Sequence, residues 1–263
     1  MVKRLIRMEI YQLVHSRMFY FMLFICCTMT LLFTSDEYLL EPIVQNTPNN
    51  LMGVFMNQMA DVGVALIIIT GCYSAYLFSE QFKQRTINLK IVCGYSRIAI
   101  YLVQCLKTFL VVGFLICFSA VVGCFKYGVE NFVHAICGDA GYFFRTIIFT
   151  FFLAFSIVSF CLVFSVAFQD TTKTLIMSFI FLFISCYIMS AVVSNMLTTE
   201  DISSAYEISK GAVLKFYPPY LWRWSLNPGL NISHLITTIC ISLFWGIGAV
   251  GIGCCVFKRK EIK

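Results

Sequence analysis

Six long stretches of apolar residues, none of which contains an Asp, Glu, Lys or Arg, dominate the chain. A helix needs about 20 mostly apolar residues to cross a hydrocarbon core about 30 Å thick. The stretches run over residues 18–35, 62–79, 108–125, 146–168, 174–197 and 232–257. This pattern predicts an all-α integral membrane protein, with six transmembrane helices in one domain over residues 18–257.

The basic residues are divided unevenly between the two sides of the predicted bundle. If the N-terminus is cytoplasmic, the inner segments hold 14 of the 19 lysines and arginines. These are Lys3, Arg4, Arg7, Arg17, Lys83, Arg85, Lys90, Arg97, Lys107, Lys173, Lys258, Arg259, Lys260 and Lys263. Because cytoplasmic segments are enriched in Lys and Arg, we expect both termini in the cytoplasm, with residues 258–263 as a short basic tail.

The N-terminal residues 1–17 have a helical apolar stripe. Its members are spaced at i, i+4, i+8 and i+11, while Lys3, Arg4 and Arg7 lie mostly off it. They are Val2, Ile6, Ile10 and Leu13. The stripe predicts an amphipathic helix that lies on the inner membrane surface. The alternative is an ordinary basic leader that only satisfies the topology.

Composition agrees with a membrane protein and leaves little room for catalysis. The chain is 60% apolar and only 12% charged, which is about half the charged fraction of a soluble domain. Most of the 13 cysteines lie in apolar runs, where they behave as small hydrophobes. The sequence contains no GxxxxGK[ST], GxSxG or HExxH motif. We therefore expect no enzyme activity, no cofactor or metal site in this chain, and no nucleic-acid partner.

Ion-coupled transporters carry an ionisable residue near the bilayer midplane, and the predicted spans contain no Asp, Glu, Lys or Arg. Lys107 stands just before the third span. We expect its ammonium group to snorkel to the cytoplasmic interface, although a place in a transport pathway stays open. A secondary transporter is therefore disfavoured, and any ATP-driven action needs a partner that binds ATP.

The segment from Ser79 to Lys107, between the second and third spans, begins polar and basic and becomes apolar. Residues 81–92 can form about three helical turns. Thr86 is a candidate N-cap, since its hydroxyl can accept a bond from a free amide of the first turn. Gly94 can end the helix in a left-handed conformation.

The same short helix is predicted to present one apolar face. Ile87, Ile91 and Val92 fall together at i, i+4 and i+5, with Lys90 outside the face. Glu80, at the inner end of the second span, is expected to pair with a nearby basic residue. A passive solvated loop would have little use for such a stripe, so the pattern predicts a surface helix that docks against something.

An ordered series of residues runs through this segment. A Glu leaves the second span, a Thr opens the short helix, a Gly ends it, Ser-Arg begins the return, and a Lys starts the third span. They are Glu80, Thr86, Gly94, Ser96, Arg97 and Lys107. In this series the chain resembles the membrane (permease) subunits of type-2 ABC exporters. It departs at Arg85, where that family usually has Gly. The start MEIYQLVHSRMFYFML and the end FKRKEI resemble those subunits too, so the resemblance extends over essentially the whole chain.

The resemblance implies a coupling segment, residues 79–97, that sits in a groove of a separate ATPase subunit. Its implied contact residues are Glu80, Arg85, Thr86, Ile87, Ile91, Gly94, Ser96 and Arg97. A second, smaller contact would be the turn Gln169–Lys173, with Asp170 and Lys173. The implied assembly pairs this permease with a second one, the same or different, and with two cassette ATPase subunits that bind ATP and Mg. It would lie in a cell membrane, expected to be bacterial.

The implied substrate comes from the same resemblance. Small members rich in Phe and Cys, without soluble insertions, resemble the permeases of bacteriocin and lantibiotic self-immunity exporters. The predicted cargo is therefore an antimicrobial peptide or another membrane-partitioning compound. Two alternatives stay open, a non-transporting membrane scaffold or sensor subunit and a secondary transporter. For Glu80 and Arg97 the alternative is that they merely flank the spans as interfacial charges.

Overall fold

The computed structural model describes residues 2–33, 48–130, 133, 137, 140–197, 216–218, 221 and 232–260. In this part of the chain the secondary structure is helical, as the sequence predicted. The eight helices are α1 (Val2–Val14), α2 (Arg17–Phe33), α4 (Pro48–Lys83), α5 (Thr86–Val92), α6 (Arg97–Tyr127), α8 (Ala140–Phe168), α9 (Thr171–Leu197) and α12 (Ile232–Arg259). The acidic residues Asp36, Glu37 and Glu41, which follow the first predicted span, lie outside the described residues, as do residues 261–263 of the predicted basic tail.

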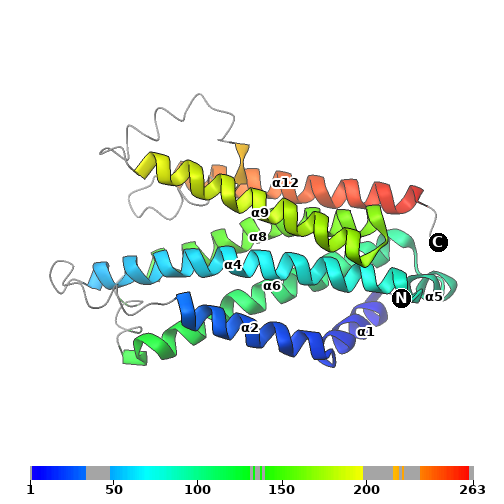
Figure 1. The fold of residues 1–263 in the computed structure, drawn as a ribbon, viewed down its shortest axis with the longest axis horizontal. Helices are drawn as coiled ribbons and strands as arrows, with labels where there is room; N and C mark the ends of the chain where they lie inside the picture. Colours follow the sequence, from blue (N-terminus) through cyan, green and yellow to red (C-terminus); the bar gives the residue numbers. More distant parts are fainter. Residues whose placement is uncertain are drawn as a thin grey trace.

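The long helices run side by side along one axis (Figure 1). The two N-terminal helices, α1 and α2, meet at a bend of 61°. Figure 1 shows α1, α5 and the C-terminal end of α12 together at one end of the bundle, called here the α5 end. The short helix of the predicted coupling segment therefore lies beside both termini of the described chain.

Four of the described helices, α4, α6, α8 and α12, are long and apolar enough to cross a bilayer, and the bent pair of α1 and α2 would make a fifth span. In α9 the side chains are described over Thr171–Ser185, an apolar stretch of 15 residues that is shorter than a span. The chain is thus an integral membrane protein with several membrane-crossing helices, and the described residues of each of the six predicted stretches lie on a helix.

The helices extend beyond the apolar stretches that predicted them. The second begins at Pro48 and the third at Arg97, although their charge-free stretches begin at residues 62 and 108. The charge-free stretch marks only the part of each helix that fits the hydrocarbon core. The backbone hydrogen bonds of the helix continue into the polar residues on either side. Pro48 is tolerated at the start because the first helical residue needs no amide partner.

Buried hydroxyl groups inside the bundle are satisfied mostly by their own helices. Thr70 donates to the carbonyl of Leu66 at 2.7 Å, and Thr150 donates to that of Thr146 at 2.9 Å. Ser165 on α8 donates to its own helix and also to the carbonyl of Ala75 on α4, each at 3.1 Å. Such back-bonding lets small polar residues lie in an apolar medium that supplies no water.

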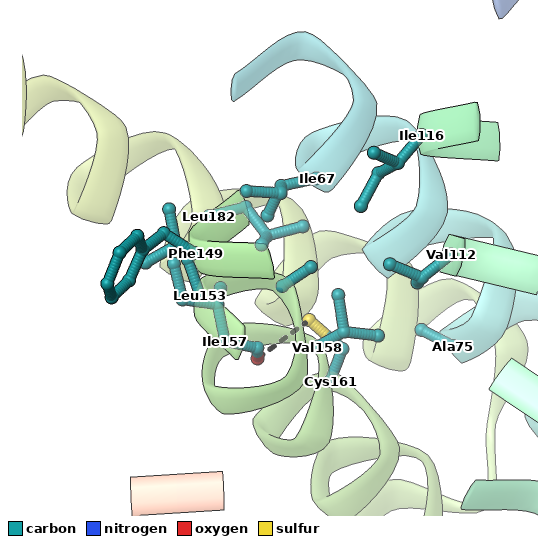
Figure 2. Packing of buried hydrophobic residues seen from close by; sticks show 11 residues of the cluster. Ile67, Ala75, Val112, Ile116, Phe149, Leu153, Ile157, Val158, Cys161 and Leu182 are labelled. Carbon is teal, nitrogen blue, oxygen red and sulfur yellow. Dashed lines mark hydrogen bonds between the residues drawn. The ribbon is translucent and has the colours of Figure 1, made fainter. Parts of the chain in front are cut away.

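Helix α8 lies at the centre of the apolar core. Its residues Phe149, Leu153 and Cys161 meet Ile67 of α4 and Leu182 of α9 (Figure 2). A second core cluster, at the α5 end, draws side chains from more of the chain. It contains Leu5, Phe78, Phe82, Ile87, Ile100, Tyr101, Val103, Cys105, Leu162, Val166 and Phe257. This second cluster fixes α1, α5 and the end of α12 on the bundle.

Candidate functional site

Arg85 separates α4 from α5 by adopting a left-handed backbone conformation, with φ 57° and ψ 15°. It caps α5 without a side-chain hydrogen bond. The prediction of Thr86 as the N-cap is therefore wrong by one residue. Thr86 is the first residue of α5, and its hydroxyl donates to the carbonyl of Gln81 at 3.1 Å. The predicted three-turn helix is also too long, because its first residues, 81–83, belong to α4.

Arg85 occupies a conformation that favours glycine, the residue that the resemblance noted above implies at this place. A left-handed conformation costs a residue with a Cβ about 1–2 kcal/mol. Arg85→Gly should therefore raise the free energy of unfolding by about 1 kcal/mol, after the greater backbone freedom of glycine in the unfolded chain is subtracted. Thermal unfolding in mild detergent measures the change. The matched control is Gln84→Gly, which relieves no left-handed residue and should destabilise; equal shifts for both variants would contradict the explanation.

Gly94 ends α5 as the sequence predicted, with φ 88°. Its amide donates to the carbonyl of Ile91 at 2.9 Å, and the Tyr95 amide donates to that of Lys90 at 3.2 Å. This pair of bonds is a Schellman motif, which satisfies the last free carbonyls of a helix. Ser96 then caps α6, its hydroxyl accepting from the Ala99 amide at 3.2 Å. Gly94 and Ser96 thus set the direction in which the chain leaves α5.

The apolar residues of α5 face two ways, which corrects the predicted single face. Ile87 is fully buried in the core cluster at the α5 end, and Ile91 packs against that cluster. Val92 is 84% exposed and Leu89 is 64% exposed. Ile87 and Ile91 therefore hold α5 on the bundle, while Leu89 and Val92 form its outward apolar surface, called here the outer face of α5.

Lys90 is buried together with Ile87, although the sequence placed it outside the apolar face of the helix. Its side chain is 6% exposed, and its ammonium group donates to Glu9, which is 1% exposed on α1. It also donates to the side-chain oxygen of Gln81 on α4 at 2.7 Å. One lysine of α5 therefore ties that helix to α1 and α4 together.

Lys107 completes the arrangement from α6. Its ammonium group lies 2.6 Å from a Glu9 carboxylate oxygen, and the lysine is 7% exposed. The snorkelling predicted for Lys107 is therefore wrong, because the side chain turns inward to a buried carboxylate. The Gln104 amide donates to Gln81 at 3.0 Å, and the Gln81 amide donates to Glu9 at 3.3 Å. These five residues, from four helices, form the charge cluster.

The charge cluster contains one carboxylate and two ammonium groups. Burial alone would raise the pKa of Glu9, but Lys107 and Lys90 outweigh burial and lower the pKa to about 2. Glu9 is therefore ionised at any physiological pH. Removing ions from water costs several kcal/mol each, and close pairing with further hydrogen bonds is needed to offset that cost. Gln81 supplies two such bonds, because its amide donates to Glu9 and its oxygen accepts from Lys90, while Gln104 donates to Gln81.

The charge cluster was missed in the sequence because its members stand in three separate segments. One signal was present. Glu9 is the single acidic residue in residues 1–17 and lies four residues after Leu5 and four before Leu13. The structure buries Leu5 and Glu9 and leaves Val2 and Ile10 exposed. The buried face of α1 is thus rotated from the predicted stripe and contains a carboxylate.

Arg97, predicted as an ATPase contact, binds the end of α12. Its guanidinium donates to the carbonyls of Lys260 at 2.8 Å and Lys258 at 3.4 Å. The ammonium group of Lys260 in turn donates to the carbonyl of Ala167, near the end of α8. Because α8 leads directly into the turn Gln169–Lys173, these bonds bring the two predicted contact segments to the same end of the bundle.

The remaining candidate residues have local partners. Asp170 accepts a bond from the backbone amide of Lys173 at 2.9 Å, so it caps the start of α9, and both residues are exposed. Glu80 accepts from the amide of Gln84 at 3.0 Å, which is a neutral partner in place of the predicted basic one. The Asp170 bond fixes the start of α9 and the Glu80 bond supports the end of α4, two places where the resemblance implies contacts.

Comparison of the sequence with models of known protein families and with curated proteins finds no match. The residues themselves therefore carry the functional argument.

Proposed function

We propose that this chain is the permease subunit of an ATP-driven exporter and that α5 is its contact with a separate cassette ATPase. The observation that carries the proposal is the outer face of α5. Leu89 and Val92 are exposed on a short helix at the end of the bundle, next to the exposed cations Lys83 and Arg85. An apolar surface with a basic border, placed beyond the membrane-crossing helices, suits a soluble protein partner.

The proposed topology has six spans, with both termini and α5 in the cytoplasm. The fifth span is α9, which is 27 residues long over its whole helix, and the first is α2. Exposed basic residues at the α5 end support this orientation, because cytoplasmic segments are rich in Lys and Arg. They are Lys3, Arg4, Arg7, Lys83, Arg85, Lys173, Lys258 and Arg259.

The proposed assembly contains two permeases and two ATPase subunits, with a transport pathway between the permeases and ATP hydrolysed by the partner. The proposed cargo is an antimicrobial peptide or another membrane-partitioning compound, and the membrane is that of a bacterial cell. The outer segments carry nine acidic against five basic residues in the sequence. That excess would enrich cationic species weakly near the outer surface, within a Debye length of about 8 Å.

The docking proposal is tested with charges on the outer face of α5. The double variant Leu89→Asp/Val92→Asp should lose at least tenfold in binding to the cassette ATPase, because it places two carboxylates in an apolar contact. Folding should be preserved, since both side chains are exposed. Binding is measured by co-purification in mild detergent followed by titration of the purified ATPase.

The matched control is Val129→Asp, an exposed apolar position just beyond the far end of α6. It should bind the ATPase as the wild type does. If the double variant binds normally, or the control loses binding equally, α5 is not the docking helix. Transport that continues after ATP depletion would instead favour a secondary transporter.

A further inference from the structure

The charge cluster joins the N-terminal helix to the proposed docking helix. Glu9 carries the carboxylate of the charge cluster, and its two oxygens have different partners. One oxygen accepts from Lys90 on α5 and the other from Lys107 on α6. A single side chain of α1 therefore contacts both the helix that would meet the ATPase and a helix that crosses the membrane.

The two lysines are unequal in their surroundings. Lys107 is the eleventh residue of α6, about 15 Å along that helix from its start at 1.5 Å per residue. It is fixed in a membrane-crossing helix. Lys90 lies on a helix of seven residues, between a left-handed turn at Arg85 and a glycine turn at Gly94. A shift of α5 would therefore move Lys90, whereas Lys107 would stay.

One carboxylate needs only one ammonium group to be neutralised. If Lys90 leaves, Glu9 keeps Lys107, so the buried carboxylate is never unpaired. Lys90 itself can regain water, because its neighbour Leu89 is already exposed at the end of the bundle. If Glu9 had only Lys90, release of α5 would leave a bare buried charge, which is strongly unfavourable. Lys107 therefore allows the contact between Glu9 and Lys90 to break without leaving Glu9 unpaired.

We propose that Glu9 is a positioning residue, which holds α5 through a releasable bond to Lys90 while Lys107 anchors it to the membrane domain. This inference rests on the proposed function of α5, which gives the movement its purpose. When the ATPase displaces α5, Lys90 exchanges Glu9 for water, and the polar contact between α1 and α5 is lost. The N-terminal helix is then a part of the coupling apparatus as well as a membrane-surface helix.

The first test needs no partner. Hydrogen–deuterium exchange is measured on the isolated chain in lipid nanodiscs, followed by peptide mass spectrometry. Lys90→Met should speed exchange in α5 and α1 several-fold while α8 and α12 stay unchanged, because Glu9 keeps Lys107. The matched control is Lys83→Met, an exposed lysine at the end of α4, which should change neither helix. Lys90→Arg, which keeps the charge, should restore slow exchange.

Unchanged exchange of α5 and α1 in Lys90→Met would overturn the inference. So would an equal rise in all helices, which would mean that Lys90 only supports the fold.

The second test uses the complex with the ATPase. Lys90→Met should bind the ATPase as the wild type does, because the outer face of α5 is intact, yet transport several-fold less cargo per ATP hydrolysed. Wild-type transport per ATP in that variant would overturn the inference even if docking is proved. If no ATPase binds the wild type, the proposed function fails, and the exchange test still decides whether Glu9 holds α5.

Discussion

Glu9→Gln will lower the free energy of unfolding by about 3–5 kcal/mol, the cost of leaving a buried ion without its partner. The variant removes the carboxylate that both Lys90 and Lys107 contact. Two buried ammonium groups would then repel each other, with only amide oxygens to accept their bonds. Reversible unfolding in mixed micelles measures the loss.

Because one carboxylate serves two ammonium groups, the losses in the free energy of unfolding of variants at Glu9, Lys90 and Lys107 should not add. Lys90→Met and Lys107→Met should each cost much less than Glu9→Gln, because each leaves one carboxylate with one ammonium group. The double variant Lys90→Met/Lys107→Met should lose more free energy of unfolding than the sum of the two single variants, since it leaves the buried Glu9 carboxylate without an ammonium partner. The triple variant with Glu9→Gln should recover most of the loss, as buried ion clusters are often replaceable by apolar groups. Additive losses across the series would contradict the shared-carboxylate explanation.

Gly253→Ala will destabilise the chain by about 1–3 kcal/mol, the usual cost of overfilling a packed core. A methyl group on Gly253 would overlap the Tyr101 ring and hydroxyl. Tyr101 is fully buried and packs near Phe78 and Phe257, with ring centroids 6.0 and 6.3 Å away, so it has little room to move.

The same helix supplies the control for this variant. A Cβ on Gly251 meets nothing within 4 Å, and Gly251 is exposed. Gly251→Ala should therefore be neutral or stabilising, because alanine favours a helix more than glycine does. Thermal unfolding of both variants in the same detergent is the measurement. A loss in Gly251→Ala as large as that in Gly253→Ala would mean that α12 does not pack on Tyr101.

The sequence predicted the helices well because their signal is local. A run such as 146–168 is uninterrupted by charge, and the structure forms α8 over Ala140–Phe168. Gly94 was likewise predictable, since few other residues end a helix in a left-handed conformation. Both predictions need only neighbouring residues and the properties of the bilayer.

The predictions that failed depend on which way a side chain turns between helices. Lys107 was expected at the cytoplasmic interface because a lone lysine near a membrane normally reaches water, and Lys90 was placed outside the apolar face of α5. Their inward turn is decided by Glu9, more than 80 residues earlier in the chain. Which face of α5 is buried is also decided by residues distant in the sequence, because the core cluster contains Ile87 and leaves Leu89 exposed. Periodicity on a seven-residue helix cannot distinguish these two faces.

The central claim is that the α5 end is cytoplasmic and is covered by a partner, and the chain's own cysteines can test it. Cys93 is exposed at the end of α5, and Cys137 is exposed between α6 and α8, whose adjoining ends lie at the opposite end of the bundle (Figure 1). The measurement is labelling with a membrane-impermeant maleimide, read at each cysteine by peptide mass spectrometry. In intact cells Cys137 should be labelled and Cys93 should not. In inverted vesicles Cys93 should react once peripheral proteins are stripped, and bound ATPase should protect it. Labelling of Cys93 from outside intact cells would contradict the account.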